Sequence, residues 1–134
     1  MYPKKVAEDT AKVLQSYLTY QAVRTIIDQL SETNPPLSLW LRSYTSSHSI
    51  QDGEAYIEGL MTENKELVLR IMTVREHLAE QVLEFLPEMV KTGIINANTD
   101  HRRQLLERLT RTTSSFSSLE TSDFNPDVED TPDS

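Results

Sequence analysis

The chain has 134 residues, enough for one domain, and a formal net charge of −8. It contains no cysteine, which excludes disulfides and thiolate metal sites, and no run approaches the roughly 18 apolar residues of a membrane span. The acidic excess is concentrated in residues 112–134, which hold no Lys or Arg, whereas residues 1–111 carry a net charge of −2. This nearly neutral part lacks the basic surface that nucleic acids require. Because the first residues, Met1 to Lys5, lack the apolar core of a signal peptide, we expect a soluble, intracellular protein.

Helix breakers are few. The sequence holds three Gly and six Pro, and the prolines lie near the boundaries of apolar segments. Branched and aromatic residues do not alternate with polar ones over any long stretch, so the pattern does not indicate strands. We therefore predict an all-α fold with four main helices.

The first predicted helix covers residues 4–33 and presents more apolar surface than one core contact uses. At about 100° per residue, Tyr17 and Tyr20 share a face with Val13 and Ile27. Because a surface helix needs an apolar stripe only about 100° wide, this helix has surface to spare for a second partner. The remaining apolar residues that widen the arc are Ala7, Ala11, Leu14, Leu18, Val23, Ile26 and Leu30.

Polar residues border the tyrosine face. Gln21, Arg24 and Asp28 lie along its edge, which distinguishes it from a dry core seam. Rigid aromatic side chains edged by polar groups are typical of recognition surfaces. Interior packing of both tyrosines, with satisfied hydroxyl groups, is the alternative on the helix pattern alone.

The first helix ends before two prolines, since the residue before a proline is pushed out of the helical region. Asn34 is predicted to cap a short second helix with a proline in its first turn. Residues 43–49 are rich in Ser and are predicted to form a loop. Trp40 is expected to anchor the core, with a surface hot spot as the less favoured alternative.

A third helix is predicted over residues 50–61. Ser49 and Asp52 have the three-residue spacing of a capping box. The residues expected to face inward are Ala55, Tyr56, Ile57 and Leu60.

The fourth helical pattern is unusually long. From residue 64 to residue 111 only Pro87 and Gly93 interrupt it. Unbroken, residues 64–108 would span on the order of 65 Å, whereas a compact domain of this size is about 35 to 40 Å across. The segment therefore either breaks or extends past its own protomer, with a kink expected at Pro87. An overlong last helix favours a homodimer in which a second chain covers its outer half.

The charges of this helix allow two interpretations. Glu76, Glu80, Glu84 and Glu88 repeat every four residues and form either a solvated face or a row that pairs with arginines of a second chain. The arginines available for such pairing are Arg102, Arg103 and Arg108. Beyond this helix, residues 112–134 are predicted to form a disordered acidic tail.

Catalytic signatures are missing from the sequence. No HExxH metal motif and no Gly-rich phosphate loop occurs. His77 lies near several glutamates, but Thr73 occupies the position where a helical di-iron site needs Glu. We therefore predict no enzyme activity, no cofactor and no metal site.

Seven blocks of the sequence, in their order along the chain, resemble the RbcX family of Rubisco assembly chaperones of cyanobacteria and plastids. The similarity covers residues 4–111, and the ordered set is far more specific than any single block. The blocks are QSYLTYQA at 15–22, TNPPL at 33–37, LWL at 39–41, QDGEAY at 51–56, LRIMTVREH at 69–77, FLPEMV at 85–90 and RRQ at 102–104.

The resemblance implies an arc-shaped homodimer of helical protomers with long, kinked last helices. It also implies binding of the extended C-terminal segment of the Rubisco large subunit in a central apolar groove. Such a dimer would clamp large-subunit dimers during assembly of the octameric core, until the small subunit releases it. Tyr17 and Tyr20 match the groove tyrosines, and Val13 shares their face. The residues that match a peripheral surface for the body of the large subunit are Gln29, Glu32, Arg70 and Arg102, adjoined by Thr33 and Asn34.

The implied partners are therefore the Rubisco large subunit and a second copy of the chain, with no nucleic acid and no membrane. The implied location is the cyanobacterial cytoplasm, with association with the carboxysome left open. A structural or regulatory helical dimer without chaperone activity is the main alternative, and an enzyme with a carboxylate-rich site is a distant third.

Overall fold

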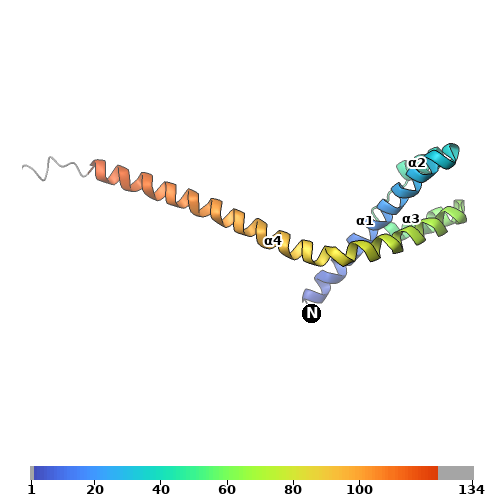
Figure 1. Cartoon of the computed structure of the whole chain (residues 1–134), viewed down its shortest axis with the longest axis horizontal. Helices are drawn as coiled ribbons and strands as arrows, with labels where there is room; N and C mark the ends of the chain where they lie inside the picture. Colours follow the sequence, from blue (N-terminus) through green and yellow to red (C-terminus); the bar gives the residue numbers. More distant parts are fainter. Residues whose placement is uncertain (1, 124–134) are drawn as a thin grey trace, which may run out of the picture. The chain divides into compact units, whose positions relative to one another are not determined.

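The computed structural model describes residues 2–123, and four α-helices follow one another within them (Figure 1). They are α1 (Tyr2–Thr33), α2 (Pro35–Ser47), α3 (Gly53–Glu63) and α4 (Lys65–Asp123). No strand occurs in this described range, so the predicted all-α fold with four main helices is confirmed. Contacts divide the chain into two units, Met1–Phe85 and Leu86–Ser134, which are described separately below.

Side-chain caps fix three of the helix starts, and at α4 the Asn64 side-chain carbonyl accepts a hydrogen bond from the Leu67 amide at 3.1 Å. The Asn34 side-chain carbonyl accepts a hydrogen bond from the Leu37 amide at 3.3 Å, as the sequence predicts. At α3 the cap is Asp52, whose carboxylate accepts hydrogen bonds from the amides of Glu54 at 3.1 Å and Ala55 at 3.2 Å. The predicted capping box of Ser49 and Asp52 is therefore wrong, because Asp52 is itself the cap and Ser49 accepts from the nearby Gln51 amide.

The loop predicted at residues 43–49 is also wrong, because α2 continues to Ser47. Serine is unfavourable inside a helix when its hydroxyl forms hydrogen bonds that compete with those of the helix backbone. Here the Ser46 hydroxyl donates to the Arg42 carbonyl at 3.0 Å, and the Ser47 hydroxyl donates to the Ser43 carbonyl at 3.2 Å. These bonds run back along the helix, so they do not interrupt its backbone ladder.

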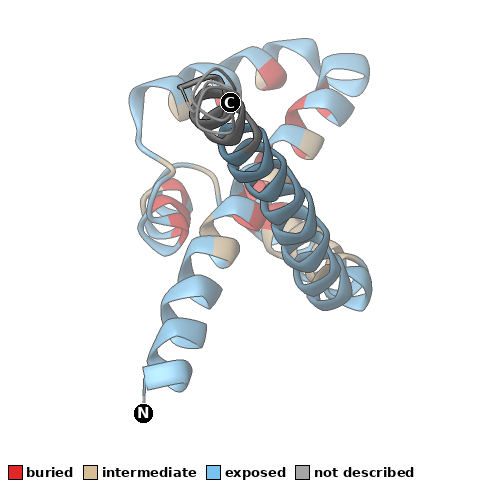
Figure 2. Ribbon diagram, turned by 90° about the vertical axis from the view of Figure 1, so that its left-hand side faces the viewer, coloured by how far each residue is buried: buried red, intermediate tan, exposed pale blue. Residues whose placement is uncertain are grey.

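The core lies in the first unit, where every buried residue among those described falls between Leu18 and Ile71 (Figure 2, red). Full burial of one such aliphatic side chain contributes about 1.5–3 kcal/mol. Two buried hydroxyls are hydrogen-bonded. Thr19 donates to the Gln15 carbonyl of its own helix at 2.8 Å, and Ser38 of α2 donates to the Ile27 carbonyl of α1 at 3.0 Å. The core side chains are Ala22, Val23, Ile26, Ile27 and Leu30 of α1, Leu41 of α2, Tyr56, Ile57 and Leu60 of α3, and Leu67, Val68 and Ile71 of α4.

Trp40 does not anchor this core, contrary to the expectation. Its side chain is 38% exposed, whereas Leu41 is fully buried. Leu41 shares its helix face with Ser38, and Trp40 lies about 100° to one side. There it stacks on Tyr44, with ring centres 5.5 Å apart, and Tyr44 stacks in turn on His48 at 3.9 Å.

Ala55, expected to face inward on α3, is exposed as well.

In the second unit α4 continues as a single helix through Pro87 and Gly93. It ends at Asp123, so part of the predicted disordered tail, residues 112–123, is helical. Residues 124–134, the rest of that tail, lie outside the described residues. Among the side chains of this unit that the structure describes, the large apolar ones at least half exposed are Met89, Val90, Ile94, Ile95, Leu105, Leu106 and Leu109.

Among the helices that the structure describes, none combines the length and the hydrophobicity needed to cross a membrane.

Candidate functional site

The tyrosine face of α1 is open to solvent. Val13 is 71% exposed, Tyr17 is 56% exposed and Tyr20 is 37% exposed. The residues between the two tyrosines, Leu18 and Thr19, are buried. One side of α1 therefore packs in the core while the aromatic side stays free, which argues against interior packing of the tyrosines.

One residue of the predicted face belongs elsewhere. Ile27 is only 8% exposed and joins the core, so the exposed apolar face ends near Tyr20. It is continued by Arg24, whose guanidinium carbon lies 5.9 Å from the centre of the Tyr20 ring. A cation–π contact at an exposed site contributes about 0.5–1 kcal/mol and limits the ring's freedom.

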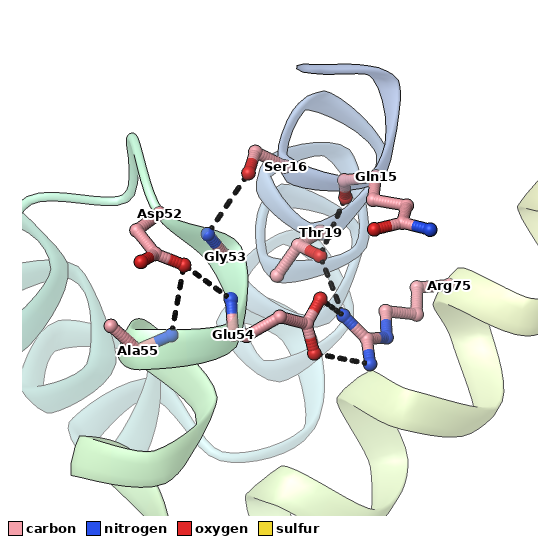
Figure 3. Close-up of polar contacts among 8 residues, drawn as sticks. All are labelled: Gln15, Ser16, Thr19, Asp52, Gly53, Glu54, Ala55 and Arg75. Atoms are coloured by element: carbon pink, nitrogen blue, oxygen red, sulfur yellow. Dashed lines mark hydrogen bonds and ion pairs between the residues drawn. The ribbon is translucent and has the colours of Figure 1, made fainter. Parts of the chain in front are cut away.

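A polar network holds the tyrosine segment of α1 against α3 and α4 (Figure 3). Arg75 of α4 forms a two-pronged ion pair with Glu54 of α3, with Nη1–Oε2 at 2.8 Å and Nη2–Oε1 at 3.1 Å. The same Nη1 donates to the Thr19 hydroxyl at 3.0 Å. Arg75 is 25% exposed and Glu54 57%, so water screens the pair and its net contribution is modest. Its geometry nevertheless fixes three helices at one point, next to Tyr20.

Gly53 forms a close contact between α3 and α1. Its amide donates to the Ser16 hydroxyl at 3.0 Å (Figure 3). A Cβ atom on Gly53 would lie 2.9 Å from the Thr19 hydroxyl oxygen and 3.1 Å from the Ser16 Cα atom. Only a residue without a side chain fits this contact. On α1 the contact is made by Ser16, which directly precedes Tyr17.

Sequence reasoning missed this network. Arg75 lies 56 residues from Thr19 and 21 from Glu54, so no local pattern links them. The one available signal was Gly53 directly after the capping residue Asp52, a position where helix formation alone does not call for glycine.

The residues of the predicted peripheral surface fall into two groups. In the first unit, Arg70 donates to the Gln29 side-chain carbonyl at 2.9 Å and thereby joins α4 to α1. Glu32, Thr33 and Asn34 follow at the end of α1, where the Asn34 side chain also caps α2. Arg102 is exposed and lies in the second unit.

Two buried or half-buried tyrosines are perturbed, for packing reasons. Burial raises the pKa of Tyr56, and the hydrogen bond that its hydroxyl makes with Thr45 at 2.8 Å partly offsets this. Burial and the nearby Glu63 carboxylate raise the pKa of Tyr44. Both groups are therefore neutral near pH 7 and take part in packing. Within residues 2–113, whose side chains the structure describes, no group of three or more His, Asp or Glu side chains is placed to hold a metal ion.

The chain matches the family model described as RbcX protein over residues 1–111. A RuBisCO chaperone RbcX from an Anabaena species is 62% identical over 117 residues, which cover 87% of this chain and 86% of the relative. A second RuBisCO chaperone RbcX, from a Picosynechococcus species, is 59% identical over 128 residues, which cover 96% and 94%. The resemblance inferred from the seven sequence blocks is thus confirmed.

A crystal structure of RbcX in complex with substrate is 64% identical to this chain and superposes with a TM-score of 0.76. The match covers 82% of this chain and 99% of the crystallised one. This similarity supports the all-α fold independently of the sequence blocks.

Proposed function

Because the chain belongs to the RbcX family, we propose that it is an assembly chaperone that binds the C-terminal peptide of the Rubisco large subunit. The exposed face of Val13, Tyr17 and Tyr20 forms the binding groove in this proposal. The dimer then clamps large-subunit dimers while the octameric core assembles. It has no catalytic step, needs no cofactor, and acts in the cyanobacterial cytoplasm.

The exposure of Tyr17 and Tyr20 carries the proposal. An aromatic ring offers a large contact area and loses little rotamer freedom on binding, which suits it to an extended apolar segment. The segment that bears the rings is held from behind by the core and by the network of Arg75, Glu54 and Thr19. A surface fixed in this way loses little further freedom when a peptide binds.

A homodimer supplies the second wall of the groove. In the described part of the second unit, apolar side chains of α4 are exposed and no side chain is buried, whereas a helix in a protein gains most of its stability from packing. The row of glutamates on α4 is exposed and available to pair with arginines of a second copy, and it consists of Glu76, Glu80, Glu84 and Glu88. Twofold association uses the same surface on both copies, so an interface that includes the tyrosine face would bring two such faces to one axis.

Calorimetric titration with the C-terminal peptide of the large subunit tests the function. We expect saturable binding with one peptide per dimer, because a groove on a twofold axis offers one site for two chains. Sedimentation of the free protein gives the oligomeric state for the same sample. A monomer in sedimentation would contradict the proposal. An absence of binding heat in titrations at several temperatures would contradict it as well.

Arg70 is expected to act outside the groove. We predict that Arg70→Ala leaves the affinity for the isolated peptide within about twofold but lowers the yield of assembled large-subunit core. The reason is that Arg70 is hydrogen-bonded to Gln29, near the C-terminal end of α1. That end carries the predicted peripheral residues, whereas Tyr17 and Tyr20 lie further towards its N-terminus. Peptide titration and a reconstitution assay on the same variant separate the two effects. Equal loss of both activities would remove the distinction between groove and periphery.

A further inference from the structure

A hollow opens between α1 and α2 at the edge of the tyrosine face. Its volume is about 430 Å³, and Tyr20 and Arg24 line it from α1 while Arg42 lines it from α2. Val23 and Ile27 form its apolar floor, and both are buried parts of the core. The floor therefore belongs to the packed core, and the two arginines line the hollow from different helices.

The charges of the hollow favour an anion. Within the part of the chain whose side chains the structure describes, neither Arg24 nor Arg42 forms an ion pair. One carboxylate, Asp28, also lines the hollow, so the two arginines leave a net positive charge. The hydroxyls of Thr45 and Ser46 are already used, since they donate to backbone carbonyls of α2. The arginines are thus the groups available to a ligand.

The hollow continues the predicted groove. Tyr17, Tyr20 and Arg24 follow at intervals of three and four residues, which places them along one face of α1. Four residues of helix advance by about 6 Å. An extended peptide advances by about 3.3 Å per residue, so its side chain over Tyr20 and its side chain at the hollow would be about two residues apart.

We propose that Arg24 and Arg42 form a subsite that binds a carboxylate of the client peptide, next to the aromatic contact with Tyr20. This inference rests on the proposed function and specifies the chemistry of its ligand. A planar carboxylate matches the guanidinium group, which can donate two parallel hydrogen bonds to it. The carboxylate is either an Asp or Glu side chain of the peptide or the α-carboxylate of its end. A doubly charged phosphate would be disfavoured more strongly by Asp28.

Calorimetric titration of the full chain with the C-terminal peptide of the large subunit tests the subsite. We expect Arg24→Gln and Arg42→Gln each to weaken binding roughly tenfold, since each removes a charge-assisted hydrogen bond. Lys65→Gln removes the same charge from an exposed position that does not line the hollow, and is expected to change the affinity less than twofold. The double variant carries both Arg24→Gln and Arg42→Gln. Added salt is expected to weaken peptide binding by the wild type more than peptide binding by this double variant.

The peptide side of the experiment identifies the carboxylate. Each Asp or Glu is replaced in turn by Asn or Gln, and a further peptide has an amidated end. We expect one of these altered peptides to bind the wild-type protein about as weakly as the parent peptide binds the double variant. When that altered peptide is titrated into the double variant, we expect little further loss of affinity.

Three outcomes would overturn the subsite. If the double variant binds the parent peptide as tightly as the wild type, the arginines do not contact it. If the double variant dissociates into monomers, the arginines belong to the interface between copies. If the wild-type protein does not bind the peptide, the proposed function fails and the subsite with it, whereas the first two outcomes leave the proposed function standing.

Discussion

Replacing Tyr17 and Tyr20 by alanine is expected to abolish peptide binding while leaving the protein folded. Each ring is exposed in the chain, at 56% and 37%, so its loss removes few internal contacts. Substitutions at such surface positions usually change the free energy of unfolding by less than about 0.5 kcal/mol. At an interface, truncation of a central tyrosine costs about 2 kcal/mol or more. This corresponds to roughly 30-fold weaker binding for each single variant.

The measurements are calorimetric titration for binding, circular dichroism for helicity and sedimentation for the dimer. Tyr2→Ala is the matched control, because Tyr2 is 82% exposed and lies at the far end of the same helix. We expect this control to bind the peptide like the wild type. Loss of helicity or of the dimer in the Tyr17 or Tyr20 variant would instead assign these side chains to the structure of the assembly.

Gly53→Ala is expected to destabilise the fold by about 1–3 kcal/mol, the usual cost of inserting a methyl group into a close contact. The new Cβ atom would lie 3.1 Å from the Ser16 backbone, which cannot rotate away as a side chain would. Relief requires α3 to move from α1, and this movement would lengthen the hydrogen bond from the Gly53 amide to Ser16. The shift would also disturb the segment that bears Tyr17, so weaker peptide binding is expected as well.

Gly93→Ala is the matched control for this prediction. A Cβ atom at Gly93 meets nothing within 4 Å, and the residue lies inside a helix. Alanine there is expected to stabilise the helix by about 0.5–1 kcal/mol, because it restricts the unfolded chain more than glycine does. Denaturant titration of both variants gives the two free energies. Gly53→Ala with unchanged or higher stability would show that α1 and α3 do not pack as closely as described.

Much of the fold was predictable because local signals are strong. A proline pair stops α1, Asn34 caps α2 and the periodicity of residues 64–111 marks α4. The errors arose where local preference and tertiary environment disagreed. The serines of residues 43–49 favour a loop, yet α2 extends to Ser47 with their hydroxyls bonded back along the helix.

The site was predictable to a different degree for each of its parts. Tyr17, Tyr20 and Val13 share a face because three- and four-residue spacing on a helix is geometry, and the structure leaves that face exposed. Their role as a peptide groove stays a prediction. The client-binding roles of the peripheral residues stay predictions as well, and these residues are Gln29, Glu32, Thr33, Asn34, Arg70 and Arg102. The contact between Arg70 and Gln29 spans 41 residues and had no local signal.

The sequence by itself determined the helical class, the apolar surplus of the first helix, the separation of acidic charge into the last residues and, through its ordered blocks, the family. These properties depend on residues within a few turns of one another, where spacing alone decides which side chains share a face. Only the tertiary structure decided which apolar face of α1 is buried and which partners fix it. Arg75, Glu54 and Thr19 meet because α4, α3 and α1 each bring one of them to the same point, and the hollow between Arg24 and Arg42 exists because α2 folds back on α1. Such contacts depend on the docking of whole helices, which no short stretch of sequence encodes.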